Sequence, residues 1–167
     1  MPQDMRVGIG FDFHRFAPDR PLVLGGVTIP FEQGLLGHSD ADAVLHAVTD
    51  AILGAAGLGD IGTHFPDADP RFSGASSVGL LEEAYRRVCE RGYRVGNIDV
   101  VVLAEVPKIR PHVASMQIRI ARSLEVTPAD IGIKATTMEG RGLIGRKEGI
   151  AAQAVAMLYR AETEPGA

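Results

Sequence analysis

Near its N-terminus the chain carries the stretch Gly8-Ile9-Gly10-Phe11-Asp12-Phe13-His14-Arg15-Phe16, which is typical of a β-strand with a polar end. Alternate side chains of a strand leave on the same face, roughly 6–7 Å apart. We therefore expect Asp12 and His14 to point the same way, so that one metal ion could bridge their tips. A polar strand end that enters a turn has the same pattern, and this stretch alone favours that simpler interpretation.

The composition predicts a single soluble globular domain. The 167 residues are 46% hydrophobic and 23% charged, and 17 basic against 21 acidic residues give a formal net charge of −4. No basic stripe is present, which argues against nucleic acid as the main partner. Cys89 is the only cysteine, so an intrachain disulfide framework and a thiolate zinc finger are excluded. We expect Cys89 to be a small buried hydrophobe.

The chain has no pattern that directs it to a membrane. No apolar run approaches the roughly 18 residues of a membrane helix. The strand pattern begins within a few residues of Met1, which leaves no room for a signal peptide. We therefore expect a cytoplasmic protein with no membrane partner.

Hydrophobic periodicity predicts several elements of secondary structure. Strands are expected at 7–11, Leu22–Leu24, Val27–Ile29, 98–104 and 131–137, and helices at 39–57, 76–91 and 107–124, with a one-turn helix at 127–130. Residues 58–74 are rich in Gly, Pro and Asp and are expected to form a loop. Residues 149–161 alternate like a strand although their alanines suit a helix. The order of elements predicts an α+β fold with helices on one face of a sheet.

The helix expected at 39–57 supplies a third candidate ligand. Ser39 is the predicted N-cap and Gly57 the C-terminal glycine, and His46 lies mid-helix on the polar side. Asp12, His14 and His46 form a set that suits zinc, with a fourth coordination position left open, as in catalytic sites. A solvated helix histidine fits His46 equally well, so the residues alone leave both interpretations open.

Common catalytic motifs are missing. The stretch Gly8-x-Gly10 has Phe13 where the dinucleotide fingerprint needs its third glycine, and no phosphate-binding P-loop is present. HExxH and GxSxG are also missing. His38 beside Ser39 is explained more simply by the helix cap than by a serine nucleophile.

Four blocks of sequence together resemble the 2-C-methyl-D-erythritol 2,4-cyclodiphosphate synthase family of the non-mevalonate isoprenoid pathway. They are GxGxDxHRF at 8–16, GLLGHSDADAVLHAVTDAILGAAGLGDIGTHFPDADP at 34–70, AEVPKIRPH at 104–112 and KATTMEGRGLIGRKEGIA at 134–151. The resemblance implies one catalytic α+β domain at 1–162 with a mixed sheet whose last element is a strand. It also implies a homotrimer with active sites at the subunit boundaries. Residues 163–167 are expected to be a disordered tail.

The resemblance implies a metal-dependent phosphorus–oxygen lyase. Its reaction cyclises 4-diphosphocytidyl-2-C-methyl-D-erythritol 2-phosphate to 2-C-methyl-D-erythritol 2,4-cyclodiphosphate and releases CMP. Asp12, His14 and His46 would be the ligands of Zn2+, and Glu139 a ligand of Mg2+ or Mn2+ on the substrate diphosphate. His38 and Thr137 would align the phosphates and stabilise the transition state.

The same resemblance assigns the substrate contacts. Those for the methylerythritol unit and the neighbouring mobile loop are Asp60, Ile61, Gly62, Phe65, Pro66, Asp67, Ala68 and Asp69. Those for the cytidine side are Ala104, Glu105, Val106, Pro107, Lys108, Ile109, Arg110, Thr136, Leu143 and Arg146. Ser39 and Met138 are further candidates for substrate contact. The family's threefold channel can hold an isoprenoid diphosphate, with Arg146 at one mouth, and the sequence leaves open whether this chain binds one.

Two other functions are compatible with the same ligand set. A zinc phosphodiesterase would attack with metal-bound water, and solvent oxygen would then enter the product. A non-catalytic trimer that binds isoprenoid diphosphates would release no CMP. The presence of Glu139, His38 and Thr137 argues against the second alternative.

Overall fold

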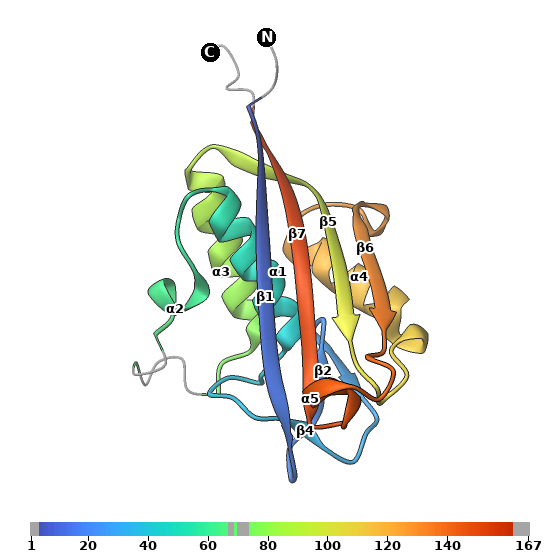
Figure 1. Cartoon of the computed structure of the whole chain (residues 1–167). Coiled ribbons are helices and arrows are strands. Elements are labelled where there is room, and N and C mark those ends of the chain that lie inside the picture. The colour runs from blue at the N-terminus through green and yellow to red at the C-terminus, as the bar shows by residue number, and fades with distance from the viewer. Residues whose placement is uncertain (1–3, 67–68, 70–73, 162–167) are drawn as a thin grey trace, which may run out of the picture.

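The computed structural model describes residues 4–66, 69 and 74–161 and has one five-stranded mixed sheet in the order β4-β1-β7-β5-β6 (Figure 1). The strands are β1 (Met5–Ala17), β4 (Gly34–Leu35), β5 (Tyr93–Leu103), β6 (Ile131–Thr136) and β7 (Gly149–Arg160). β5 and β6 are parallel, and the other neighbouring pairs are antiparallel. A separate hairpin joins β2 (Leu22–Leu24) to β3 (Val27–Ile29).

Helices cover one face of the main sheet, as Figure 1 shows. They are α1 (Ala43–Ala55), α3 (Ser77–Glu90) and α4 (Val113–Ser123). Two short helices lie elsewhere: α2 (Ile61–His64) lies beside α1, and α5 (Gly142–Gly145) lies on the opposite face, near Phe11 and Phe13. The 3-10 turns are η2 (Arg110–His112) and η3 (Pro128–Asp130). α1 packs on β1 and β7, and α3 packs on α1. The predicted α+β fold is therefore confirmed. Among the described residues, no helix combines the length and apolar character needed to span a bilayer.

Two glycines of β1 allow α1 to lie directly against the strand. A Cβ atom at Gly8 would lie 2.1 Å from the carbonyl oxygen of Ala51, and one at Gly10 would lie 1.9 Å from that of Ala47. Any side chain at either position would push the helix away from the sheet. The Gly8-x-Gly10 pattern thus serves helix–strand packing.

The same alternation places the first two candidate ligands toward α1. Gly8 and Gly10 are buried on the helix-covered face, and the period of two continues this face through Asp12 and His14. The antiparallel register pairs Asp12 with Ala152 and His14 with Ile150 of β7. Both ligand candidates therefore stand where α1 begins.

The opposite face of β1 and β7 is apolar and open. Met5, Val7, Ile9 and Phe11 are 60–70% exposed, and Val155 is 40% exposed. Apolar side chains clustered on a sheet face are typical of a surface that another chain covers.

α1 begins at Ala43, so the prediction of a helix from residue 39 with Ser39 as its cap is wrong. Ala41 has a φ of 58°, a left-handed conformation that a helix cannot include. Ser39 Oγ accepts a hydrogen bond from Ala41 N–H at 3.1 Å. Asp42 is the N-cap and accepts a hydrogen bond from Leu45 N–H at 3.0 Å. Gly57 lies just past the helix end, with a φ of 69°.

The helix expected at 107–124 also begins later than predicted. The Val106–Pro107 peptide bond is cis, and helical geometry starts only at η2, where Pro111 occupies the first turn. A proline is compatible with the first turn of a helix, because its missing amide hydrogen would have no partner there. Lys108 is therefore exposed ahead of the helix and not at its positive end.

The remaining predictions differ from the structure mainly in length. The strands at 22–24 and 27–29, the helix at 76–91 and the turn at 127–130 are confirmed. Residues 149–160 form a strand, which resolves the open alternative. The loop at 58–74 includes the short helix α2, and Cys89 is half-buried where a fully buried side chain was expected. The tail predicted at 163–167 lies outside the described residues.

Candidate active site

Asp12, His14 and His46 converge where the polar end of β1 meets the start of α1. Each offers one ligand atom, and these atoms lie within 4.8 Å of one another. Asp12 Oδ2 lies 2.8 Å from His14 Nε2 and 2.9 Å from His46 Nδ1. The two ring nitrogens are 3.1 Å apart. The sequence predicted this grouping, although His46 is in the first turn of α1 and not in mid-helix.

The outer hydrogen bond of His14 fixes which ring nitrogen faces the cluster. Its Nδ1 lies 2.8 Å from the carbonyl oxygen of Leu36. A carbonyl oxygen can only accept a hydrogen bond, so Nδ1 must carry the hydrogen. The lone pair of His14 Nε2 then points at Asp12 and His46.

His46 is oriented in the same manner by two residues from outside β1 and α1. Ser77 Oγ donates its hydrogen to Asp40 Oδ1 and therefore accepts from His46 Nε2–H at 2.9 Å. Asp40 Oδ2 also accepts from Ser77 N–H at 3.0 Å. Ser39 Oγ lies 3.2 Å from the same imidazole nitrogen. The lone pair of His46 Nδ1 is thus left facing the cluster.

These hydrogen bonds give the three residues the electronic character of a metal site. When both imidazoles are neutral, their lone pairs and one carboxylate oxygen point at one another, and a cation must lie between them: a metal ion, or a proton that forms a hydrogen bond to Asp12. Burial raises the pKa of Asp12, but hydrogen bonds with His14 and His46 outweigh it, so the net pKa is well below its ordinary value. Burial lowers the pKa of His14, but hydrogen bonding to Asp12 outweighs it and the net shift is upward. One carboxylate and two imidazoles are a donor set suited to Zn2+.

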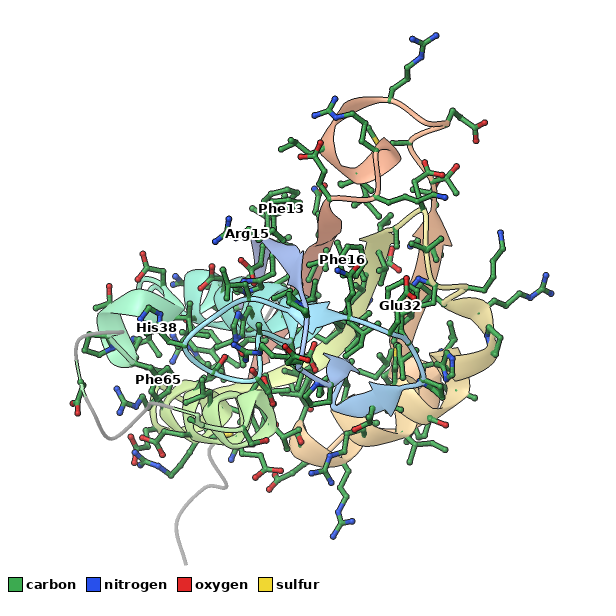
Figure 2. The ribbon with its side chains drawn as sticks, turned by 90° about the horizontal axis from the view of Figure 1, so that it is seen from below. Phe13, Arg15, Phe16, Glu32, His38 and Phe65 are labelled. Atoms are coloured by element: carbon green, nitrogen blue, oxygen red, sulfur yellow. The ribbon has the colours of Figure 1, made fainter. Side chains whose placement is uncertain are left out.

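The cluster opens into a cavity of about 240 Å3. Five further residues that the sequence assigned to substrate or catalysis line the same cavity: His38, Ser39, Ile61, Gly62 and Phe65. Of these, Phe65 is only 6% exposed. Figure 2 shows His38 and Phe65 on the same side of the molecule, with Glu32 across from them.

Asp60 stands beside this cavity as the cap of α2. Its Oδ1 accepts hydrogen bonds from Thr63 N–H at 2.8 Å and from Thr63 Oγ1–H at 2.7 Å. Hydrogen bonding to Thr63 lowers the pKa of Asp60, so the carboxylate is ionised and able to accept further donors. Pro66 is exposed and Asp69 half-buried. Asp67 and Ala68 lie outside the described residues.

The residues predicted for nucleotide and the second metal form a separate group at the ends of β5 and β6. Ala104 N–H donates to the carbonyl oxygen of Thr136 at 3.0 Å. Glu105 Oε1 accepts from Met138 N–H at 2.8 Å, and Thr137 Oγ1 donates to Glu139 Oε1 at 2.8 Å. Glu139 is exposed with a φ of 50°.

Within one chain these two groups do not share a cavity. Among the described residues, none of those predicted on the cytidine side lines the cavity beside Asp12. Lys108, Arg110, Leu143 and Arg146 are exposed, whereas Ile109 is buried in the core. Val106 and Pro107 are half-buried.

The sequence missed Asp40, Asp50 and Ser77 as supports of the site. Asp40 and Ser77 lie near the starts of the helices expected at 39–57 and 76–91, and no signal singled them out. Asp50 Oδ1 accepts the N–H of Ile61 at 2.7 Å and so ties α1 to α2. The only feature of the sequence that indicated this role is the spacing, because Asp50 follows His46 by four residues and shares its helix face.

Comparisons with known proteins agree with this geometry. A sequence model of the YgbB family matches residues 5–159. The chain belongs to the YgbB family. This assignment covers every strand of the main sheet and all three residues of the cluster.

Three similar proteins define the relationship more closely. The 2-C-methyl-D-erythritol 2,4-cyclodiphosphate synthase of Pectobacterium atrosepticum is 57% identical over 159 residues, which are 95% of this chain and 96% of the relative. The bifunctional IspDF of Campylobacter jejuni superposes with a TM-score of 0.92 at 46% identity, covering 96% of this chain but only 43% of that longer one. The Plasmodium falciparum IspF structure, a CDP complex, has a TM-score of 0.83 at 34% identity over 95% and 97% of the two chains.

Proposed function

We propose that this protein cyclises 4-diphosphocytidyl-2-C-methyl-D-erythritol 2-phosphate to 2-C-methyl-D-erythritol 2,4-cyclodiphosphate, with release of CMP, as a step of isoprenoid biosynthesis in the cytoplasm. The observation that carries the proposal is the convergence of Asp12, His14 and His46 at the wall of one cavity. The YgbB family match and the 57% identity to a named synthase give the chemistry of the substrate.

The reaction depends mainly on how the substrate is held, because the nucleophile is part of the substrate and not of the protein. An oxygen of the 2-phosphate forms a bond to the β-phosphorus, while the bond from that phosphorus to the oxygen bridging to the α-phosphorus breaks. The electron pair of the broken bond leaves with CMP. Because nucleophile and target belong to one molecule, holding the substrate folded with the two oxygens in line supplies much of the rate.

The Asp12 cluster fits a zinc ion. A bound Zn2+ with an open position would polarise a phosphate oxygen and make the phosphorus more electrophilic. The role of the chain is to fix the two imidazole lone pairs, through Leu36 and Ser77, so that the donors are preorganised. His38 stands in the same cavity and would align a phosphate group there.

Glu139 and Thr137 would act on the diphosphate. A Mg2+ or Mn2+ ion held by Glu139 would offset the negative charge that moves to the leaving CMP. The Thr137 hydroxyl holds the Glu139 carboxylate in place at 2.8 Å and would contact a phosphate oxygen. Asp60 would accept the methylerythritol hydroxyls beside Ile61 and Gly62, while Lys108 would bind phosphate from its exposed position.

The separation of the two groups of residues supports a site shared between subunits of a trimer. The metal cluster would come from one subunit, and the residues of the cytidine side from its neighbour. The apolar face formed by Met5, Val7, Ile9, Phe11 and Val155 offers the surface that such an assembly buries.

An apolar hollow of about 390 Å3 lies on this part of the sheet, lined in part by Phe11, Phe13, Leu143 and Ile144. We place the hydrocarbon of an isoprenoid diphosphate there, in the channel of the trimer, with Arg146 available to its diphosphate. Retention of a farnesyl diphosphate analogue by the purified trimer, lost on Phe11→Ser, tests this placement.

Purified protein loaded with zinc should release CMP from the cytidyl substrate in the presence of Mg2+, and phosphorus NMR should show a cyclic diphosphate. The reaction run in 18O-labelled water should leave the product unlabelled. Incorporation of solvent oxygen would mean hydrolysis by a phosphodiesterase, and an absence of CMP release would remove the catalytic proposal.

A further inference from the structure

The segment that carries Ile61 and Gly62 is too short to hold its own shape. α2 has four residues, closed by a hydrogen bond from Phe65 N–H to the Ile61 carbonyl oxygen at 2.8 Å and by the Asp60 cap on Thr63. A single helical turn is unstable in isolation, because nucleation fixes several residues for one hydrogen bond. Contacts with the rest of the molecule must therefore set its position.

The two ends of α2 are tied to different helices. At the N-terminal end, Ile61 N–H donates to Asp50 Oδ1 of α1 at 2.7 Å. At the C-terminal end, His64 Nε2–H donates to the Leu58 carbonyl oxygen at 2.7 Å. This bond leaves His64 Nδ1 as an acceptor, and Arg87 Nη1 of α3 donates to it at 2.5 Å.

Arg87 makes two more contacts that fix its guanidinium in this place. Its Nε donates to Glu83 Oε1, one turn earlier on α3, at 2.9 Å. Its Cζ atom lies 5.4 Å from the centre of the Phe65 ring, within the range of a cation–π interaction. The planar guanidinium thus joins α3 to both His64 and Phe65, which a lysine ammonium could do only in part.

Phe65 connects this contact to the active site. Its ring is buried and forms part of the wall of the cavity that Asp12, His14 and His46 also line. Arg87 itself is not among the residues that line this cavity in the described part of the chain. An influence of Arg87 on substrate must therefore pass through α2 and Phe65.

We propose that Arg87 is a positioning residue for substrate binding, which holds α2 and the Phe65 wall against α3. The inference rests on the proposed function to the extent that the segment starting at Asp60 binds the methylerythritol unit. Loss of Arg87 weakens substrate binding and leaves the metal cluster intact, because the hydrogen bonds of that cluster come from Leu36 and Ser77.

Steady-state CMP release tests the effect on substrate. Arg87→Ala should raise KM about tenfold, the size expected for losing one hydrogen bond to a charged group, while kcat changes less than about twofold. Arg87→Lys should recover part of the loss. Arg86→Ala is the matched control, because Arg86 also pairs with Glu83 but makes its other contact to Glu90. An unchanged KM in Arg87→Ala, or an equal rise in Arg86→Ala, would overturn the proposal.

Hydrogen exchange tests the positioning without reference to activity. In Arg87→Ala the amides of Thr63 and Phe65 should exchange about tenfold faster than in the parent protein, with no change in Arg86→Ala. Unchanged exchange at both amides would refute the role of Arg87 whatever the kinetics. Faster exchange in a protein that releases no CMP would instead uphold the positioning role and reject the proposed function.

Discussion

At the scale of single residues, the orientation of the two histidine ligands depends on the hydrogen bond that the outer ring nitrogen of each imidazole donates away from the cluster. Ser77 occupies a special place because its own hydrogen goes to Asp40, so it can only accept from His46. Removing this hydroxyl leaves only the longer contact with Ser39 Oγ, at 3.2 Å, to orient the His46 ring and fix its tautomer. The donors of the site would then be less firmly fixed before the metal binds.

Ser77→Ala should therefore weaken Zn2+ binding by about 10–100-fold, the usual effect of losing a hydrogen-bond partner of a ligating histidine. The measurement is competition with a chromophoric chelator on metal-free protein. Ser76→Ala is the control, since Ser76 begins the same helix without a side-chain capping bond. Equal zinc affinity in both variants would show that Ser77 does not orient His46.

Predictions for single residues succeeded where the periodicity of the sequence determines the direction in which a side chain points. Asp12 and His14 share a face because a strand alternates, and this required no tertiary information. Asp40 and Ser77 are 37 positions apart in sequence, and nothing local indicates that they meet beside His46. Contacts between segments so distant in sequence depend on how α3 packs on α1, which a single sequence does not reveal.

At the scale of elements, the start of α1 is fixed by one buried carboxylate. Asp42 is fully buried and accepts hydrogen bonds from the backbone N–H groups of Leu45, Gly25 and Gly26 at 3.0, 2.8 and 2.6 Å. It thus caps α1 and also binds the turn of the β2–β3 hairpin. Asp42 lies inside the helix expected at 39–57 with Ser39 as its cap, so the sequence analysis missed both roles.

Asp42→Ala should lower the free energy of unfolding by about 3 kcal/mol, because it removes a helix cap and leaves buried amide donors without acceptors. Urea denaturation measures the change. Asp130→Ala, which removes the half-buried carboxylate of the capping box of η3, should cost about 1 kcal/mol. If the two variants lost equal stability, the hairpin contacts of Asp42 would contribute nothing.

The exposed face of α3 predicts a dependence on pH. A hydrogen bond from Arg86, which outweighs partial burial and is reinforced by Arg87, lowers the pKa of Glu83 from 4.5 to about 2. Because the folded-state pKa is depressed, the stabilisation is present above about pH 4.5 and is lost as the pH falls through about 2. Glu83→Gln should therefore show a smaller fall in melting temperature between about pH 5 and pH 3. A fall equal to that of the parent protein would contradict this.

At the scale of the whole molecule, the order of elements was predictable but their packing was not. Alternation and helical periodicity gave the α+β class and most strands, since each is a local property. The close approach of α1 to β1 depends on Gly8 and Gly10 meeting the carbonyl oxygens of Ala51 and Ala47. The sequence shows the two glycines, but it does not show that α1, more than thirty residues away, packs directly against them.

The division of the proposed site between two groups of residues makes the assembly testable in solution. His46→Ala removes a metal ligand but should fold, because α1 packs through Val44, Val48 and Ile52, which are fully buried. Lys108→Ala removes an exposed phosphate-binding candidate on the other side. Each variant alone should release little or no CMP.

Mixing the two variants in equal amounts under conditions of subunit exchange should restore activity. In a ring whose sites each take the metal cluster from one subunit and Lys108 from the next, about a quarter of the sites then have both groups intact. Activity should rise to about a quarter of that of the parent protein, with light scattering giving the mass of a trimer. Sites built within one chain could never regain both groups by exchange, so a mixture as inactive as its components would place the whole reaction inside a single subunit.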